Sequence, residues 1–286
     1  MASQIKTMLL LGILSALMIA VGALCGGRAG GLFAFALSLV LNIGAYWFSD
    51  TIILKTYKAR EITTSEAPML HQIVGELAAN AGIPKPRLYL VPEKAPNAFA
   101  TGRNPEHAAV ACTSGILKTL TPREVRAVLA HEIAHVAHRD ILIQTIASVL
   151  ASTIIMMAVW QYKPAKGRGK NRQEQSGSLL LAILAPIAAA ILQMAISRSR
   201  EYYADEGGAA YSRDPLSLAS ALDKLQAKAG QIPMKRCNEA TASLFIVSPV
   251  FGGKISRLFS THPSTEDRIS RLQQMAESCR QGISKG

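Results

Sequence analysis

Two histidines and a glutamate stand close together in the sequence as His131-Glu132-x-x-His135. On an α-helix, side chains four residues apart lie one turn above each other, about 6 Å apart, so both imidazoles can face one metal ion. Glu132 lies about 100° round the helix axis, where it can hold and deprotonate a water molecule instead of binding the ion. The pattern indicates metal-assisted hydrolysis. Zinc suits two imidazoles, one carboxylate and an open fourth position.

The residues before this motif predict the helix that must carry it. Thr121-Pro122-Arg123-Glu124 is typical of a capping box with proline at the first helical position. Apolar residues follow at the spacing of one buried helix face. The alternative interpretation, two surface histidines with a solvated glutamate between them, is disfavoured by this amphipathic context. We call the predicted helix the zinc helix.

A catalytic zinc site needs a third protein ligand. His138 shares a helix face with His131 but lies two turns away, about 10 Å along the axis, which is too far. The candidate is Glu201, because Asp205 follows one turn later and can accept a hydrogen bond from a ligand imidazole, fixing its tautomer. In the alternative, Glu201 only pairs with a neighbouring arginine.

The composition is unusual for a soluble protein of this length. Of 286 residues, 49% are hydrophobic and 17% are charged, and the excess of apolar residues is concentrated in four runs. These runs cover residues 8–24, 31–48, 141–160 and 179–196. We therefore expect a mainly α-helical membrane protein with a small β-sheet, in which transmembrane helices carry a soluble catalytic domain.

The apolar runs also define the domain organisation. We expect an N-terminal transmembrane hairpin at residues 1–54 and a second apolar hairpin at 141–196 around the basic loop 161–178. The catalytic domain is then formed by two parts of the chain. Its first part, with the zinc helix, is expected at 55–140, and its second part, with the third ligand, at 197–286. Within the first part, residues 87–91 and 107–112 are typical of strands. A short sheet thus precedes the zinc helix.

The second hairpin separates His131 from Glu201 in the sequence. The two residues share a compartment only if both apolar runs of that hairpin cross the membrane or neither does. More Lys and Arg residues flank the apolar runs on the catalytic side, which favours a cytoplasmic catalytic domain. The loop 161–178 would then be translocated against this tendency, unless the two runs dip into the membrane without crossing it.

Net charge and cysteine content indicate which partners and which structural sites to expect. With 31 Lys and Arg against 19 Asp and Glu, the formal charge is +12. The basic residues lack interleaved aromatic residues and several flank apolar runs, so we expect contact with anionic lipid headgroups and no nucleic-acid partner. The four cysteines are scattered without a C-x-x-C pair, which argues against a disulfide framework or a structural zinc site.

Further motifs accompany the zinc helix over most of the chain. These are the double apolar hairpin at the N-terminus, the segment of Asn97, Ala98, Phe99, Ala100, Thr101 and Gly102, the run Arg200-Glu201-Tyr202-x-Ala204-Asp205, and Thr261-His262-Pro263-Ser264 with Arg268. Together with His131-Glu132-x-x-His135, this combination resembles the HtpX-type membrane metalloproteases, which are gluzincins related to the CAAX prenyl protease. The combination is far more specific than any one of its motifs.

The resemblance implies a fold and an activity. It implies a gluzincin-like catalytic domain and a zinc metalloendopeptidase with one zinc ion per chain, in which Glu132 is the general base. It places the protein in the bacterial inner membrane as a multi-pass protein with its catalytic part in the cytoplasm. There it would take part in the stress response and quality control by cleaving unfolded segments of misfolded or damaged membrane proteins.

The resemblance also implies roles that spacing does not reveal. Residues 97–102 would form an edge strand that receives extended substrate by backbone pairing, where the alternative is an ordinary loop between strands. His262 and Arg268 would lie near the metal and stabilise the oxyanion of the reaction, with helix capping by a surface His-Pro turn as the alternative. Tyr202 or Tyr203 is another candidate for stabilising the oxyanion.

Two other functions remain as alternatives. The first is a membrane-anchored scaffold or chaperone with a structural metal site, which would normally be closed by a fourth protein ligand. The second is a CAAX-type processing protease, for which the short chain with four apolar runs offers little room for a large membrane chamber.

Overall fold

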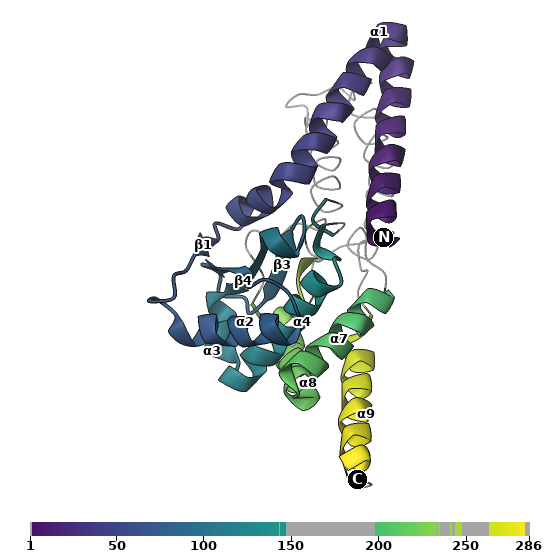
Figure 1. Cartoon of the computed structure of the whole chain (residues 1–286). Coiled ribbons are helices and arrows are strands. Elements are labelled where there is room, and N and C mark those ends of the chain that lie inside the picture. Colours follow the sequence, from purple (N-terminus) through teal and green to yellow (C-terminus); the bar gives the residue numbers. More distant parts are fainter. Residues whose placement is uncertain are drawn as a thin grey trace, which may run out of the picture.

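The computed structural model describes residues 2–142, 144–146, 198–232, 234, 241, 244–247 and 263–283 (Figure 1). Most of the second predicted hairpin, its basic loop 161–178 and His262 lie outside the described residues. The described elements are α1 Ala2–Thr56, β1 Arg60–Glu61, α2 Pro68–Asn80, β2 Arg87–Val91, β3 Ala98–Gly102, a 3-10 turn at Pro105–His107, β4 Ala108–Thr113, α3 Ser114–Thr119, α4 Pro122–Ala137, α7 Arg198–Ser212, α8 Pro215–Ala229 and α9 Thr265–Ile283. The predicted combination of many helices and a small sheet is confirmed.

Helix α1 is folded back on itself at two glycines (Figure 1). Gly27 has a φ of +59° and a ψ of −146°, a conformation that is essentially restricted to glycine. A Cβ added at Gly31 would lie 3.4 Å from the Cβ of Ala23, so the two arms of α1 meet directly after the turn. The hairpin geometry predicted for the N-terminus therefore has a local cause in the sequence.

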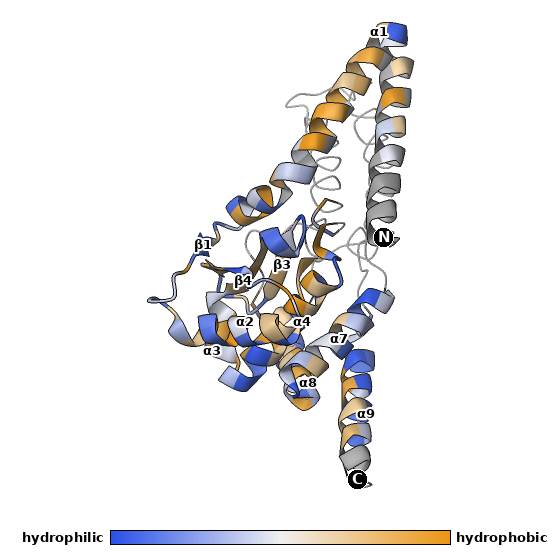
Figure 2. Ribbon diagram, in the orientation of Figure 1, coloured by the Kyte–Doolittle hydropathy of each residue, from blue (hydrophilic) through white to orange (hydrophobic). Residues whose placement is uncertain are grey.

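The second arm of α1 has the dimensions of a membrane span. In the described part of the chain, one helix is long and apolar enough to cross a membrane, the 23 residues Gly26–Phe48. At 1.5 Å per residue such a helix is about 35 Å long, more than the thickness of a hydrocarbon core. Figure 2 shows that hydrophobic residues predominate along this arm. Its large exposed apolar side chains are Leu32, Phe33, Phe35, Leu39, Val40, Ile43, Trp47 and Phe48.

A mixed four-stranded sheet follows, in the order β1-β2-β4-β3. Strand β2 pairs parallel with β4, and β3 pairs antiparallel with β4, with Phe99 opposite Ala111. The strand predicted at 87–91 is β2, the strand predicted at 107–112 is β4, shifted by one residue, and β3 lies at the edge of the sheet as the resemblance implied.

Helix α4 is the centre of the helical layer on one side of this sheet. It starts with the predicted capping box, in which Thr121 and Glu124 bond each other's backbone N–H groups, and Pro122 stands at the first position. From Val125 to Val136 every residue except Arg126 is buried. The sequence pattern predicts one buried face, but α4 is enclosed because α2, α7 and α8 pack around it.

The opposite side of the sheet is joined to the end of α1. Tyr57 packs its ring against Phe99 of β3 and Phe245, with ring centroids 5.7 and 5.2 Å away. The guanidinium of Arg103, the residue after β3, lies 4.7 Å from the ring centroid of Trp47. These contacts fix the edge strand relative to the membrane arm of α1.

Candidate metal centre

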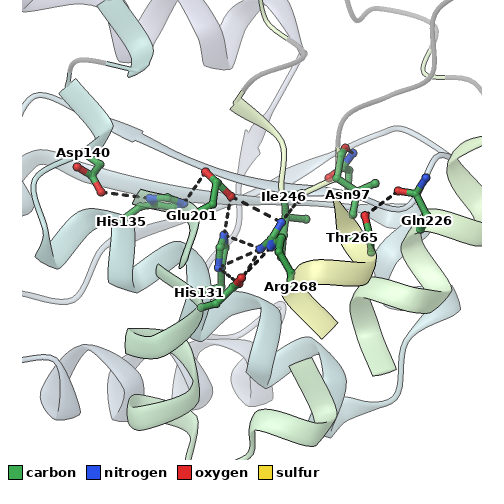
Figure 3. Close-up of polar contacts among 11 residues, drawn as sticks. Asn97, His131, His135, Asp140, Glu201, Gln226, Ile246, Thr265 and Arg268 are labelled. Carbon is green, nitrogen blue, oxygen red and sulfur yellow. Dashed lines mark hydrogen bonds and ion pairs between the residues drawn. The ribbon is translucent and has the colours of Figure 1, made fainter. Parts of the chain in front are cut away.

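Three predicted ligands meet between α4 and α7 (Figure 3). One ligand atom each of His131, His135 and Glu201 lies within 4.8 Å of the others, and all three residues are buried. Glu201 Oε2 lies 3.7 Å from His131 Nε2, and Glu201 Oε1 lies 3.5 Å from His135 Nε2. The two histidines and the carboxylate therefore converge from residues far apart in the sequence.

Two adjacent glycines allow α7 to approach α4 closely enough for this convergence. A Cβ added at Gly208 would lie 2.9 Å from the backbone nitrogen of His131 and 3.0 Å from its Cα. A Cβ added at Gly207 would lie 2.8 Å from the Cβ of Ala134. Because Glu201 lies about two turns before these glycines on the same helix, the close packing brings its carboxylate to the histidines.

Asp205 holds His131, as the spacing predicted that it could. Its Oδ1 lies 3.0 Å from His131 Nδ1, which leaves His131 Nε2 directed to Glu201. Arg268 of α9 in turn donates two hydrogen bonds to Asp205, and its Nη2 is 3.4 Å from the ring nitrogens of His131. Arg268 thus lies close to the predicted metal position, and its part in stabilising an oxyanion stays a prediction.

His135 has a carboxylate of its own on the far side of its ring. Asp140 Oδ2 lies 3.5 Å from His135 Nδ1, and Arg200 Nε lies 3.6 Å from Asp140 Oδ1. No motif in the sequence marks Asp140, because its place depends on the turn that ends α4.

The pKa values of the two histidines differ because their surroundings differ. Burial lowers the pKa of His131 to about 4 and outweighs the opposing effect of Asp205. Burial also lowers the pKa of His135, but the carboxylates of Asp140, Glu201 and Glu132 outweigh it and raise that pKa to about 9. A metal ion that binds His135 through nitrogen must therefore displace a proton from it.

Glu132 lies in the same enclosed space without binding to the other predicted ligands. Burial raises its pKa to about 7. Among the described residues, its buried Oε1 has no hydrogen-bond partner. A buried carboxylate oxygen of this kind is normally satisfied, so this atom indicates a group that the protein leaves open to a water molecule or substrate.

The charges of the described site fit a divalent cation. The buried carboxylates of Glu132, Glu201, Asp205 and Asp140 are accompanied by the guanidinium groups of Arg268 and Arg200. When all of these groups are ionised and both imidazoles are neutral, as metal binding requires, negative charges exceed positive charges by two. Two imidazoles and a carboxylate are also a ligand set that zinc prefers, so the residues present fit such an ion.

The predicted substrate strand lies beside Glu132. The backbone of Ala100 lowers the pKa of the Glu132 carboxyl group, although burial has the larger effect and raises that pKa. At the start of the strand, Ile246 N–H donates to the carbonyl oxygen of Ala98 over 3.2 Å, and Asn97 Nδ2 donates to the carbonyl oxygen of Val247 over 2.9 Å. Residues 244–247 thus cover the first part of the edge.

The remaining predicted residues are placed as follows. The side chain of Thr101 is buried and bonded to Thr145, with 3.0 Å between their hydroxyl oxygens. Tyr202 packs its ring under the guanidinium of Arg271, and Tyr203 is exposed. His262 lies outside the described residues, so its role stays a prediction.

The sequence model of peptidase family M48 matches residues 64–276. A protease HtpX homolog of Syntrophobacter fumaroxidans is 51% identical over 282 residues, which cover 96% of this chain and all of that relative. Another, of Persephonella marina, is 54% identical over 280 residues, which cover 95% of this chain and 97% of that relative.

One solved structure shows a slight likeness. The crystal structure of S. mikatae Ste24p has a TM-score of 0.49 and a sequence identity of 20%, over 95% of this chain and 65% of that chain. This chain thus spans less than two thirds of the Ste24p chain. The family assignment depends on the sequence matches, which extend over nearly the whole chain. The chain belongs to peptidase family M48, and it is a membrane metalloprotease.

Proposed function

We propose that the protein is a zinc-dependent endopeptidase in which His131, His135 and Glu201 bind one zinc ion and Glu132 is the general base. The observation that carries this proposal is the meeting of three buried ligand atoms within 4.8 Å. Two imidazoles and one carboxylate are the protein ligands of a catalytic zinc site, in which the fourth position belongs to water or substrate.

Glu132 supplies the proton transfers of the reaction. When bound, zinc would polarise the peptide carbonyl and lower the pKa of a water molecule. Glu132 takes a proton from the attacking water and then gives it to the leaving amine, so that it is a base in the first step and an acid in the second. Its Oε1 is the atom that we assign to this exchange.

Strand β3 has one edge that faces away from β4, and all five of its residues are buried. The carbonyl oxygen of Asn97 accepts from the N–H of Thr113, and backbone directions alternate along a strand. The backbone groups of Ala98, Ala100 and Gly102 therefore point away from β4. Because residues 244–247 cover the edge at Ala98, we expect substrate to pair with the strand from Ala100 onward, next to Glu132.

The natural substrates that we propose are unfolded segments of misfolded or damaged membrane proteins. The contact between Trp47 and Arg103 places the end of β3 against the membrane arm of α1, which supports cleavage close to the bilayer. The distribution of Lys and Arg supports a multi-pass protein of the bacterial inner membrane with its catalytic part in the cytoplasm.

The test is a comparison of two glutamine variants of the full-length protein in detergent. We expect Glu201→Gln to lose bound zinc and activity, because it removes a ligand charge. We expect Glu132→Gln to keep its zinc and to digest casein about 100- to 10,000-fold more slowly. Glu106→Gln, on the exposed 3-10 turn, is the matched control and should equal the wild type.

The results also separate this function from the alternatives. Casein digestion by Glu132→Gln at the wild-type rate would show that another residue is the base. Wild-type zinc content in Glu201→Gln would show that the third ligand lies elsewhere. A wild-type protein that binds zinc tightly without cleaving any protein would instead support a structural metal site in a scaffold or chaperone.

A further inference from the structure

We infer that Asp140 is a positioning residue that holds His135 in the tautomer able to bind the metal through Nε2. The inference rests on the proposed function and deepens it. Asp140 Oδ2 lies 3.5 Å from His135 Nδ1, and Glu201 Oε1 lies 3.5 Å from His135 Nε2 (Figure 3). A proton on Nδ1 that points to the carboxylate leaves the lone pair of Nε2 for the metal.

The turn that ends α4 determines the place of Asp140. The N–H of Asp140 donates to the carbonyl oxygen of His135 over 2.9 Å, and the N–H of Arg139 donates to that of Val136 over 3.0 Å. Arg139 has a φ of +61°. These are the bonds and the left-handed residue of a Schellman motif, with His135 as the third residue from the helix end. The backbone that closes the helix therefore also carries a carboxylate back to the His135 ring.

Arg200 fixes the other side of the Asp140 carboxylate. Its Nε lies 3.6 Å from Asp140 Oδ1, and both side chains are largely shielded from solvent. Arg200 directly precedes Glu201 in α7. The ion pair therefore joins the end of α4 to the residue next to the proposed third ligand.

The other proposed histidine ligand, His131, has the same arrangement of partners. His131 Nδ1 faces Asp205 at 3.0 Å, and Asp205 is held by Arg268. Each proposed histidine ligand thus has a carboxylate at Nδ1 and an arginine behind that carboxylate. Asp140 follows α4, and its arginine lies in α7, whereas Asp205 lies in α7, and its arginine lies in α9. The similarity of the two arrangements therefore does not follow from a single repeated motif. A role confined to the Arg200 ion pair or to the end of α4 would not require Asp140 Oδ2 to face the ring.

Zinc affinity of the full-length protein in detergent, measured by competition with a chelator, tests the inference. We expect Asp140→Ala to bind zinc about 10- to 100-fold more weakly than the wild type. Asp140→Asn keeps an oxygen that can accept from Nδ1, so it should lose only part of that affinity. Arg139→Gly is the matched control, because glycine is preferred at this position of the motif, and its affinity should equal that of the wild type.

A His135→Ala variant separates the possible failures. If His135→Ala loses zinc and a folded Asp140→Ala binds it as the wild type does, the positioning role is wrong and the proposed function stands. If His135→Ala binds zinc like the wild type, the proposed site is wrong. Should near-ultraviolet circular dichroism show that Asp140→Ala is unfolded, Asp140→Asn decides: we expect a fall of about three- to tenfold in affinity, and wild-type affinity overturns the inference.

Discussion

Arg268 donates from Nε and Nη2 to both carboxylate oxygens of Asp205, over 2.8 and 2.7 Å, and both residues are at most 2% exposed. Its Nη1 donates to the carbonyl oxygen of Ile246 over 2.9 Å. Asp205 in turn faces His131. A residue of α9 therefore fixes the orientation of a proposed metal ligand on α4 through two hydrogen bonds to Asp205.

Replacing Arg268 by methionine should lower the stability of the protein strongly. The substitution leaves the buried carboxylate of Asp205 without its main partner, and breaking a buried pair in this way costs about 3–5 kcal/mol. The free energy of unfolding, measured by chemical denaturation in detergent, checks this value. Arg271 lies about one turn after Arg268, on an exposed part of α9, and serves as the control. Arg271→Met removes only a contact with the Tyr202 ring and should cost at most about 1 kcal/mol. Equal losses in both variants would contradict the prediction.

Replacing Gly208 by alanine should separate α4 from α7. The new Cβ would come within 3.0 Å of the His131 backbone, so the helices must shift, at a cost of about 1–3 kcal/mol. Because Glu201 lies on the moving helix, zinc affinity should fall as well. Gly230→Ala is the control, since an added Cβ there has no atom within 4 Å. Zinc affinity and melting temperature measured for both variants test this, and a Gly208→Ala protein that binds zinc normally would refute it.

In the metal-free protein, the contribution of Glu132 to stability should be lost as the pH rises from about 4.5 to about 7. Burial raises the pKa of Glu132 from 4.5 to about 7, so between these values the unfolded chain has released a proton that the folded protein keeps. This contribution to stability is complete below pH 4.5 and is lost as the pH passes 7. Glu132→Gln cannot ionise and should exceed the wild type by on the order of 3 kcal/mol above pH 7.

Denaturation of chelator-treated wild type and Glu132→Gln at pH 4, 6 and 8 measures this difference. It should be near zero at pH 4 and should grow with pH. A difference that is the same at all three values would show that the ionisation of Glu132 does not contribute.

Removal of zinc should lower the melting temperature, because the ion balances the excess of negative charge in the site. At a free zinc concentration 1,000 times the dissociation constant, the bound ion adds about 4 kcal/mol of stability. Thermal unfolding with zinc and with a chelator checks this for the wild type and for Glu201→Gln. The variant, which lacks the proposed third ligand, should show little difference between the two conditions. A chelator effect of equal size in both proteins would mean that zinc stabilises them from another place.

The parts of the site that depend on local sequence were predictable. A capping box, a proline and residues at helical spacing define α4, and the distance of one turn relates Glu201 to Asp205. Each of these relations holds within a single helix, so no knowledge of the tertiary structure is needed.

Relations between elements were not predictable in this way. The complete burial of α4 results from three helices that surround it, two of which come from the other end of the sequence. The place of Asp140 depends on a left-handed Arg139, although glycine is the usual residue there. The contact of residues 244–247 with β3 joins segments about 150 residues apart, and no pattern in either segment indicates it.

The dispersal of the centre over the sequence has a consequence for biosynthesis. The histidines lie in α4, but Glu201 and Asp205 lie in α7 and Arg268 lies in α9. A nascent chain on the ribosome cannot complete the catalytic apparatus until the segment that carries Arg268 has been translated and has left the exit tunnel. Under the proposed function, the protein thus cannot cleave peptide bonds before Arg268 has emerged.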